Sequence, residues 1–140
     1  MNNIDFKTLL FTYQGRLNRA PYWTAIAIYV VAMLIVAALA FLLALGSAFF
    51  VVLLVVYIPL MVSGVMVGIK RLHDRDRSGW WLALFYLLPL ALNAISHGMG
   101  SFGFILSLVG LAVSIWGIVE LGFLRGTIGT NRYGPDPLAA

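Results

Sequence analysis

The sequence predicts an all-α polytopic membrane protein with four transmembrane helices in two antiparallel hairpins, preceded by a short amphipathic interfacial helix. Three observations predict this fold class. The chain has 140 residues, of which 62% are hydrophobic and 10% are charged, whereas soluble domains are about 45–50% apolar and about 25% charged. No Asp, Glu, Lys or Arg lies between Arg19 and Lys70 or between Arg77 and Glu120. Each uncharged block can hold two helices of about 20 residues, the length that crosses a bilayer.

The apolar blocks favour helices over barrel strands. Lipid offers no water to backbone amides, so only helices and closed barrels cross a membrane. Barrel strands alternate apolar and polar residues, whereas the chain from Ile26 to Leu45 is apolar on all sides. Gly46-Ser47 and the polar segment 96–101 predict the turns. We therefore expect transmembrane helices at 22–45, 48–69, 80–95 and 102–124. The third is the weakest, because it is short and contains Pro89.

The arm 1–19 predicts a short helix that lies in the headgroup layer. Asn3 is a candidate N-cap and Gly15 a candidate stop. Its apolar side chains share one broad face: Ile4, Phe6, Leu9, Leu10 and Tyr13. Apolar burial and the attraction of Lys7, Arg16 and Arg19 to anionic lipid would hold such a helix at the surface. Docking onto a partner protein is the alternative.

The basic residues predict the orientation. If four helices cross, all nine Lys and Arg fall in the arm, the loop 70–79 and the tail 125–140. By the positive-inside bias that side is cytoplasmic, so a single membrane domain, 1–140, would have both termini in the cytoplasm. A three-span alternative, with 80–95 re-entrant, would place Arg125 and Arg132 outside. The first apolar stretch is too long for a cleaved signal peptide and is expected to stay as an anchor.

Glu120 is predicted about one turn inside the cytoplasmic end of the last span. A carboxylate at that depth is costly and should face the protein interior with a cationic partner. Arg16, Arg19, Lys70 and Arg71 are predicted at similar depth, and an ion pair that locks the last helix to the central loop is the favoured interpretation. A proton- or cation-coupled transport site is the alternative, although such sites usually lie at the membrane midplane.

His73 and Asp74 are adjacent in the loop 70–79, and such a pair invites a catalytic or metal-binding interpretation. Adjacent loop residues do not by themselves form a ligand set, and His97 is predicted on the opposite side of the membrane. A structural role is favoured, with a headgroup or phosphate site as the alternative. The chain has no cysteine, which excludes disulfides and thiolate metal sites.

Small residues predict where helices approach each other. Gly64 and Gly68 form a GxxxG pair in 48–69, and a stripe in 102–124 consists of Gly103, Ser107, Gly110, Ser114 and Gly117. Such stripes allow close backbone packing in lipid. We expect them to pack the four-helix bundle, with homodimerisation as the rival use.

Three segments together resemble a known family. They read Gly15-Arg16-x-x-Arg19-x-x-Tyr22-Trp23, then Arg71-Leu72-His73-Asp74-x-x-Arg77-Ser78-Gly79-Trp80-Trp81, and finally Gly126-Thr127-x-Gly129-x-Asn131-Arg132-Tyr133-Gly134-x-Asp136-Pro137. The pattern is similar to the "domain of unknown function 805" family of small bacterial inner-membrane proteins. The resemblance implies a compact four-span protein of the bacterial inner membrane and carries no family-wide activity and no catalytic residue. The acid at Asp76 departs from the pattern.

All three motifs fall on the predicted cytoplasmic face, so we expect them to fold into one polar cap. In this cap Arg16, Arg19, Arg71 and Arg77 would pair with Asp74, Glu120 and Asp136, with Tyr22, Trp80, Trp81 and Tyr133 around them. The candidate structural or interaction residues are Arg16, Arg19, Tyr22, Trp23, Arg71, His73, Asp74, Arg77, Trp80, Trp81, Glu120, Asn131, Arg132, Tyr133 and Asp136.

The sequence favours a non-enzymatic accessory or scaffold protein whose cap binds anionic lipid headgroups or a membrane-protein partner. A small oligomeric transporter or channel that uses Glu120 is the first alternative. An enzyme acting on lipid headgroups is the second, and for it the chain offers His73, Asp74 and Asp76. No cofactor, metal or nucleic-acid partner is predicted.

Overall fold

The computed structural model describes residues 6–43, 46 and 48–139, and the regular structure in these residues is helical. This confirms the predicted all-α class. The elements are α1 (Phe6–Phe11), α2 (Arg19–Leu42), α3 (Ala48–Asp74), α4 (Trp80–Ser96), α5 (Gly100–Ile118) and the π-helical turn η1 (Val119–Phe123), which continues α5. Asn18 caps α2, since its side-chain oxygen accepts the Ala20 N–H at 3.1 Å.

Three of the helices are long and apolar enough to cross a membrane: Arg19–Leu42, Ala48–Asp74 and Gly100–Phe123. The helix α4 has 17 residues and spans about 26 Å at 1.5 Å per residue, slightly less than the roughly 30 Å hydrocarbon core. The fourth crossing therefore stays a prediction.

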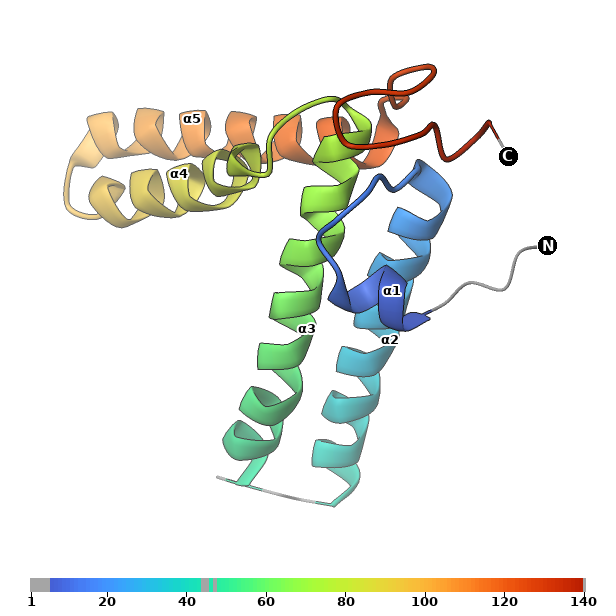
Figure 1. Cartoon of the computed structure of the whole chain (residues 1–140). Coiled ribbons are helices and arrows are strands. Elements are labelled where there is room, and N and C mark those ends of the chain that lie inside the picture. Colours follow the sequence, from blue (N-terminus) through green and yellow to red (C-terminus); the bar gives the residue numbers. More distant parts are fainter. Residues whose placement is uncertain (1–5, 44–45, 47, 140) are drawn as a thin grey trace.

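The helices form two antiparallel pairs that lie crosswise to each other (Figure 1). The helices α2 and α3 run side by side, and so do α4 and α5. The pairs meet where α3 ends, and among the described residues α5 itself approaches neither α2 nor α3. The compact bundle implied by the family resemblance is therefore not formed.

The small residues of α5 explain this arrangement, because they are used against α4. A methyl group at Gly117 would lie 2.9 Å from Phe85 Cβ, and one at Gly110 would lie 3.4 Å from Pro89 Cα. The Phe85 and Trp116 rings meet edge to face with centroids 5.2 Å apart. Close backbone approach therefore packs α4 on α5 and leaves none of this stripe for α2 or α3.

Most apolar side chains along both pairs are exposed, as lipid-facing side chains are. The buried core instead lies at the junction of the two pairs and includes Ala25, Val67, Leu72 and Leu121. A protein surrounded by hydrocarbon needs no apolar interior along its spans, because lipid tails are as apolar as leucine. The protein is therefore most tightly packed at its polar end.

The arm differs from the predicted surface helix. The helix α1 ends at Phe11, so Tyr13 lies beyond it, and Asn3 and Ile4 lie outside the described residues. Leu9 is buried in the core, and Lys70 Nζ donates to the carbonyls of Thr8 and Leu9 at 2.7 and 2.6 Å. The last turn of α1 is thus held against α3 (Figure 1).

Candidate functional site

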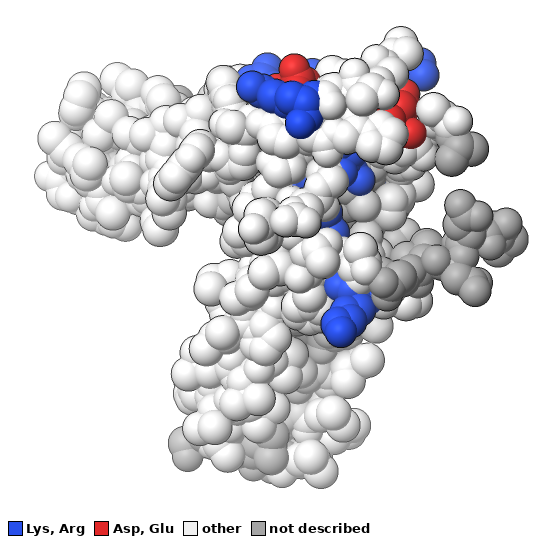
Figure 2. Space-filling view, viewed as in Figure 1, with Lys and Arg blue, Asp and Glu red and all other residues white. Residues whose placement is uncertain are grey.

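The charged residues gather at the junction of the two helix pairs, while the free ends of the pairs show neither sign of charge in this view (Figure 2). We use the name polar cap for the candidate residues that the sequence analysis grouped, together with Lys70, Arg75, Asp76, Thr127 and Gly126, which the structure adds. These residues come from the arm, the start of α2, the end of α3, the following loop, the start of α4, η1 and the tail.

The end of α3 carries the centre of the cap. The charge pattern predicted that this span ends at residue 69 and that Lys70, Arg71 and Asp74 lie in a loop. The structure corrects this prediction, because α3 continues to Asp74. Helical spacing brings Arg71 and Asp74 onto one face, where they form an (i, i+3) ion pair of 2.6 Å. The helix ends there, and Asp76 takes a left-handed conformation with φ of 55°.

Side chains from α2 and α3 satisfy the carbonyls at the end of the last helix. A helix leaves its final four carbonyls without intrahelical partners. Here Arg71 Nε donates to Leu121 O at 2.7 Å and Arg71 Nη2 donates to Leu124 O. Trp23 Nε1 donates to Gly122 O at 3.0 Å, and Arg19 Nη1 donates to Phe123 O at 3.0 Å. Four consecutive carbonyls therefore have side-chain donors.

This arrangement also suits the helix dipole, because cations stabilise the negative C-terminal end of a helix. The π-helical turn η1 ends on a Leu124 N–H that donates to Val119 O at 3.1 Å. Short π-helical segments frequently occur at functional sites. The side chain of Arg71 is fully buried, so this guanidinium joins the two helix pairs from inside the protein.

Asp74 is the acid at the centre of the cap. Its carboxylate lies 3.1 Å from Arg16 and 2.6 Å from Arg71, and the three side chains are 4% exposed or less. Its main-chain carbonyl accepts the Thr127 N–H at 2.8 Å. Gly126 passes so close that a Cβ there would collide with the Asp74 carboxylate. Asp74 therefore joins the arm, α3 and the tail.

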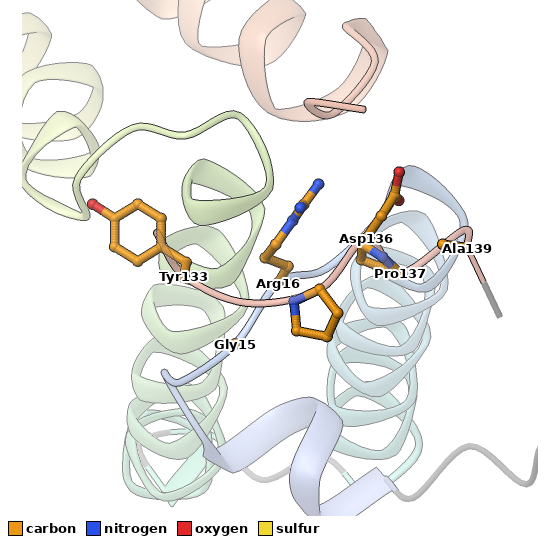
Figure 3. A pocket seen from close by; sticks show the side chains of 7 residues that line it. Gly15, Arg16, Tyr133, Asp136, Pro137 and Ala139 are labelled. Carbon is orange, nitrogen blue, oxygen red and sulfur yellow. The ribbon is translucent and has the colours of Figure 1, made fainter. Parts of the chain in front are cut away.

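Arg16 holds the tail against the arm. Besides Asp74, its guanidinium donates to the carbonyls of Gly129 and Thr127, each at 2.6 Å. In Figure 3 the tail carrying Tyr133 passes across the Gly15–Arg16 segment, and a depression of about 450 Å³ opens between them. Arg16 is the residue through which the first and last motifs of the sequence meet.

Glu120 is 2% exposed and lies between two arginines of the loop after α3. Arg75 Nε is 3.1 Å and Arg77 Nε is 2.9 Å from its Oε1 atom. Arg77 also lies over the Trp81 ring, 4.3 Å from its centroid. The expected ion pair with a cation is present, but none of the four cations predicted at its depth pairs with Glu120 in the described residues (Arg16, Arg19, Lys70 and Arg71). Arg77 was expected only as a member of the cap, and Arg75 was not expected.

Within the part of the chain that the structure describes, His73 makes a stacking contact and pairs with no carboxylate. Its ring lies parallel to Tyr133 with centroids 3.8 Å apart, and its Nδ1 is 3.2 Å from Gly15 O. Asn131 Nδ2 donates to the His73 carbonyl at 2.9 Å, and Arg132 pairs with Asp76 at 3.0 Å. No group of three His, Cys, Asp or Glu that could hold a metal ion occurs in the described part of the chain.

Several expected pairs do not form. Arg19 bonds to a carbonyl and not to a carboxylate. Asp136 accepts the N–H groups of Gly129 and Leu138 at 3.0 and 2.9 Å and forms no ion pair with an arginine within residues 6–43, 46 and 48–139. The hydrogen bonds from Leu138 and Gly129, aided by Arg16 and Arg125, lower the pKa of Asp136 from 3.8. The tail folds back on itself, so the carboxylate finds amides closer than any guanidinium.

The aromatic residues of the cap differ in whether they pack against other rings or stay exposed. Tyr22 is buried and meets Trp23 edge to face, with centroids 5.8 Å apart. Trp81 packs against Trp116 of α5. Trp80 is largely exposed and lies outside the packed part of the cap, as an aromatic residue at a membrane interface would.

Sequence reasoning missed the roles of Lys70, Arg75, Thr127 and Gly126. The role of Lys70 could have been inferred from its position beside Arg71 at the end of an apolar span. The role of Gly126 could have been inferred from its position in the last motif. No buried side-chain nitrogen or oxygen lacks a hydrogen-bond partner in residues 6–43, 46 and 48–139. The interior of the cap is therefore saturated, and polar groups for a ligand must come from its surface.

These features define a helical membrane protein whose polar residues join its helix pairs at one end. The chain belongs to the family described as protein of unknown function (DUF805), whose model matches residues 10–135. The uncharacterized protein YiiR of Escherichia coli (strain K12) is 33% identical over 132 residues, which cover 91% of this chain and 86% of YiiR. The resemblance drawn from the three motifs is thereby confirmed.

Two further relatives carry the name inner membrane protein. YhaH of Escherichia coli (strain K12) is 28% identical over 131 residues, covering 89% of this chain and 86% of YhaH. YhaI of the same strain is 29% identical over 128 residues, covering 89% of this chain and 85% of YhaI. Together with the three long apolar helices, these names support an inner-membrane location. No solved structure matches this chain.

Proposed function

We propose that this chain is a non-enzymatic accessory protein of the inner membrane whose polar cap lies at the cytoplasmic face and binds anionic lipid headgroups. One observation carries the proposal: each buried carboxylate of the cap is shared by two arginines. Asp74 has Arg16 and Arg71, and Glu120 has Arg75 and Arg77.

Both clusters keep a surplus of positive charge after pairing. The side chains of Arg75 and Arg77 are 24% and 31% exposed, so this surplus reaches the surface. The cytoplasmic leaflet is rich in anionic lipid and attracts basic groups close to it. A cap with surplus guanidinium groups at the ends of apolar helices has the charge and the position to recruit such lipids.

The proposal includes four crossings with both termini in the cytoplasm. The positive-inside bias supports this orientation, and the exposed apolar side chains on α4 and α5 are suited to contact lipid. A helix of 17 residues is accommodated by local thinning of the bilayer, and a longer neighbour by tilting.

The test is native mass spectrometry of the full chain, purified in mild detergent from a membrane of known lipid composition. We expect bound phosphatidylglycerol or cardiolipin in excess over its share of the membrane, decreasing as salt is raised. Bound lipid that matches the bulk composition at every salt concentration would contradict headgroup binding. A co-purified protein, or a mass of two chains without anionic lipid, would favour a protein partner or homo-oligomer instead.

The transport and enzyme interpretations receive less support from the geometry. Glu120 is enclosed by two arginines at the polar end of the protein, whereas transport sites lie near the midplane. The carboxylate of Asp74 is occupied by Arg16 and Arg71, and the ring of His73 is stacked on Tyr133. Neither acid is presented to a substrate.

A further inference from the structure

A second depression, of about 210 Å³, opens beside the start of α2 and is lined by Arg19 and Arg125. Both arginines are exposed, and neither pairs with a carboxylate within residues 6–43, 46 and 48–139. Arg19 uses only Nη1, on Phe123 O, which leaves its Nε and Nη2 donors available. Two guanidinium groups that form no ion pair in the described residues therefore line one cavity, and Asp136 acts on Arg125 only at longer range.

The remaining lining does not neutralise this charge. Asp74 also borders the depression, but its carboxylate is held by Arg16 and Arg71. Those three side chains together carry one positive charge, which adds to the charges of Arg19 and Arg125. The site therefore has a surplus of positive charge at the level where α2 enters its apolar span.

Exposed aromatic rings lie on the apolar side of the two arginines. Trp23 follows Arg19 by one helical turn on α2, and such pairs share a helix face. The Trp23 ring meets Phe123 edge to face, with centroids 5.7 Å apart, and both rings are exposed. Trp23 is fixed by its hydrogen bond to Gly122 O. Rings at this depth are suited to contact acyl chains.

We propose that this depression binds the phosphate of an anionic glycerophospholipid, with Arg19 and Arg125 donating to the phosphate oxygens and the acyl chains lying along Trp23 and Phe123. Arginine binds phosphate through parallel N–H donors, which gives geometric specificity. This site rests on the proposed function and specifies where in the cap the headgroup is held.

The size and the donors of the site agree with this ligand. Pockets that hold whole drug-sized molecules measure about 300–1,000 Å³, so a depression of about 210 Å³ fits a headgroup phosphate and leaves the rest of the lipid outside. The arginines supply the charged donors of the lining, whereas the Ala20 N–H already donates to the Asn18 side-chain oxygen at 3.1 Å.

The experiment compares lipid retention by the full chain and four variants in nanodiscs of phosphatidylglycerol and phosphatidylcholine. Arg125→Gln removes a side chain that makes no hydrogen bond in the described residues. The double variant Arg19→Gln/Arg125→Gln removes both donors. Arg132→Gln is the matched control, because it removes an exposed arginine that is paired with Asp76. Arg19→Lys keeps the positive charge but replaces the guanidinium that donates to Phe123 O. It therefore shows whether the effect of Arg19→Gln in the double variant comes from the lost charge or from the lost hydrogen bond.

We expect phosphatidylglycerol affinity to fall about fivefold for each arginine removed from the depression. Arg132→Gln, which removes an arginine outside the depression, should cost clearly less than Arg125→Gln, and Arg19→Lys should stay close to the wild type. Excess inorganic phosphate should displace little of the bound lipid, because free phosphate lacks the acyl contacts. Wild-type preference that persists in the folded Arg125→Gln and double variants would overturn this site while leaving the proposed function intact. Absence of any preference in the wild type would overturn both, and complete displacement by inorganic phosphate would overturn the lipid as the ligand.

Discussion

The guanidinium of Arg71 and the carboxylate of Asp74 lie 2.6 Å apart, one turn from each other on α3, with side chains 0% and 4% exposed. Arg71 donates onward to the carbonyls of Leu121 and Leu124, and Asp74 accepts from Arg16 of the arm. The pair therefore connects the two crosswise helix pairs, the arm and the tail at one point. Predictions about stability follow from this connection.

Asp74→Asn is expected to lower the free energy of unfolding by about 3–5 kcal/mol, because it leaves the buried Arg16 and Arg71 without a counter-charge. Asp76→Asn makes the same chemical change in a pair with Arg132 whose side chains are 60% and 44% exposed, and should cost about 1 kcal/mol or less. Thermal unfolding in detergent micelles measures both. Equal destabilisation by the two variants would show that Asp74 has no special role.

Arg71→Lys keeps the positive charge but cannot reproduce the forked contacts that one guanidinium makes with Leu121 O, Leu124 O and Asp74. We expect a clear loss of stability, about 1–3 kcal/mol for the carbonyl left without a donor. Arg132→Lys, at an exposed arginine, should be close to neutral. Hydrogen exchange of η1 amides would show whether the end of α5 opens first. Unchanged exchange in Arg71→Lys would argue against the capping role.

Gly126→Ala should disturb the cap, because the added Cβ would collide with the Asp74 carboxylate. Overpacking of this kind costs about 1–3 kcal/mol. The matched control is Gly64→Ala, whose Cβ would meet only Tyr29 Cε2, at 3.9 Å, and which replaces glycine inside a helix with a better helix former. Gly64→Ala should be as stable as the wild type or more so, and the opposite order would contradict the described path of the tail.

The tail turn at Asp136 should depend on pH. Hydrogen bonds from Leu138 and Gly129 lower the pKa of this carboxyl below 3.8, so the folded turn favours the charged form. Its contribution is complete above pH 3.8 and is lost as the pH falls through the lower, folded value. Limited proteolysis of the tail across this range would follow the loss. Asp136→Asn should remove the pH dependence, and an unchanged profile would refute the assignment.

Single cysteines can test the topology, because the natural chain has none. With four crossings, Ser101→Cys should react with an impermeant thiol reagent from the periplasm in spheroplasts. Thr130→Cys should react only after the membrane is opened. If both positions react only after opening, neither α4 nor α5 crosses the membrane and the four-span topology is wrong. Both residues are exposed in the structure, so a lack of reaction reports location and not burial.

Particular residues show how far sequence reasoning reached. The N-cap at Asn18 was predictable because capping depends on neighbouring residues alone. That Glu120 pairs with a cation was predictable, since a buried acid at a helix end needs one. The choice of Arg75 as a second partner was not, because the chain offers several arginines at similar depth and only the path of the loop after α3 selects among them.

The sequence by itself determined that this is a helical membrane protein and that its charges collect at the helix ends, because solvation acts on each stretch of chain independently of the others. Only the tertiary structure decided that the α2–α3 and α4–α5 pairs lie crosswise and that Arg71, Trp23 and Arg19 satisfy the end of the last helix. Those outcomes depend on which surfaces approach closely enough to bond. The close contacts at residues such as Gly117 and Gly126 determine how near the segments lie to each other, and a local sequence pattern cannot predict such contacts between distant segments.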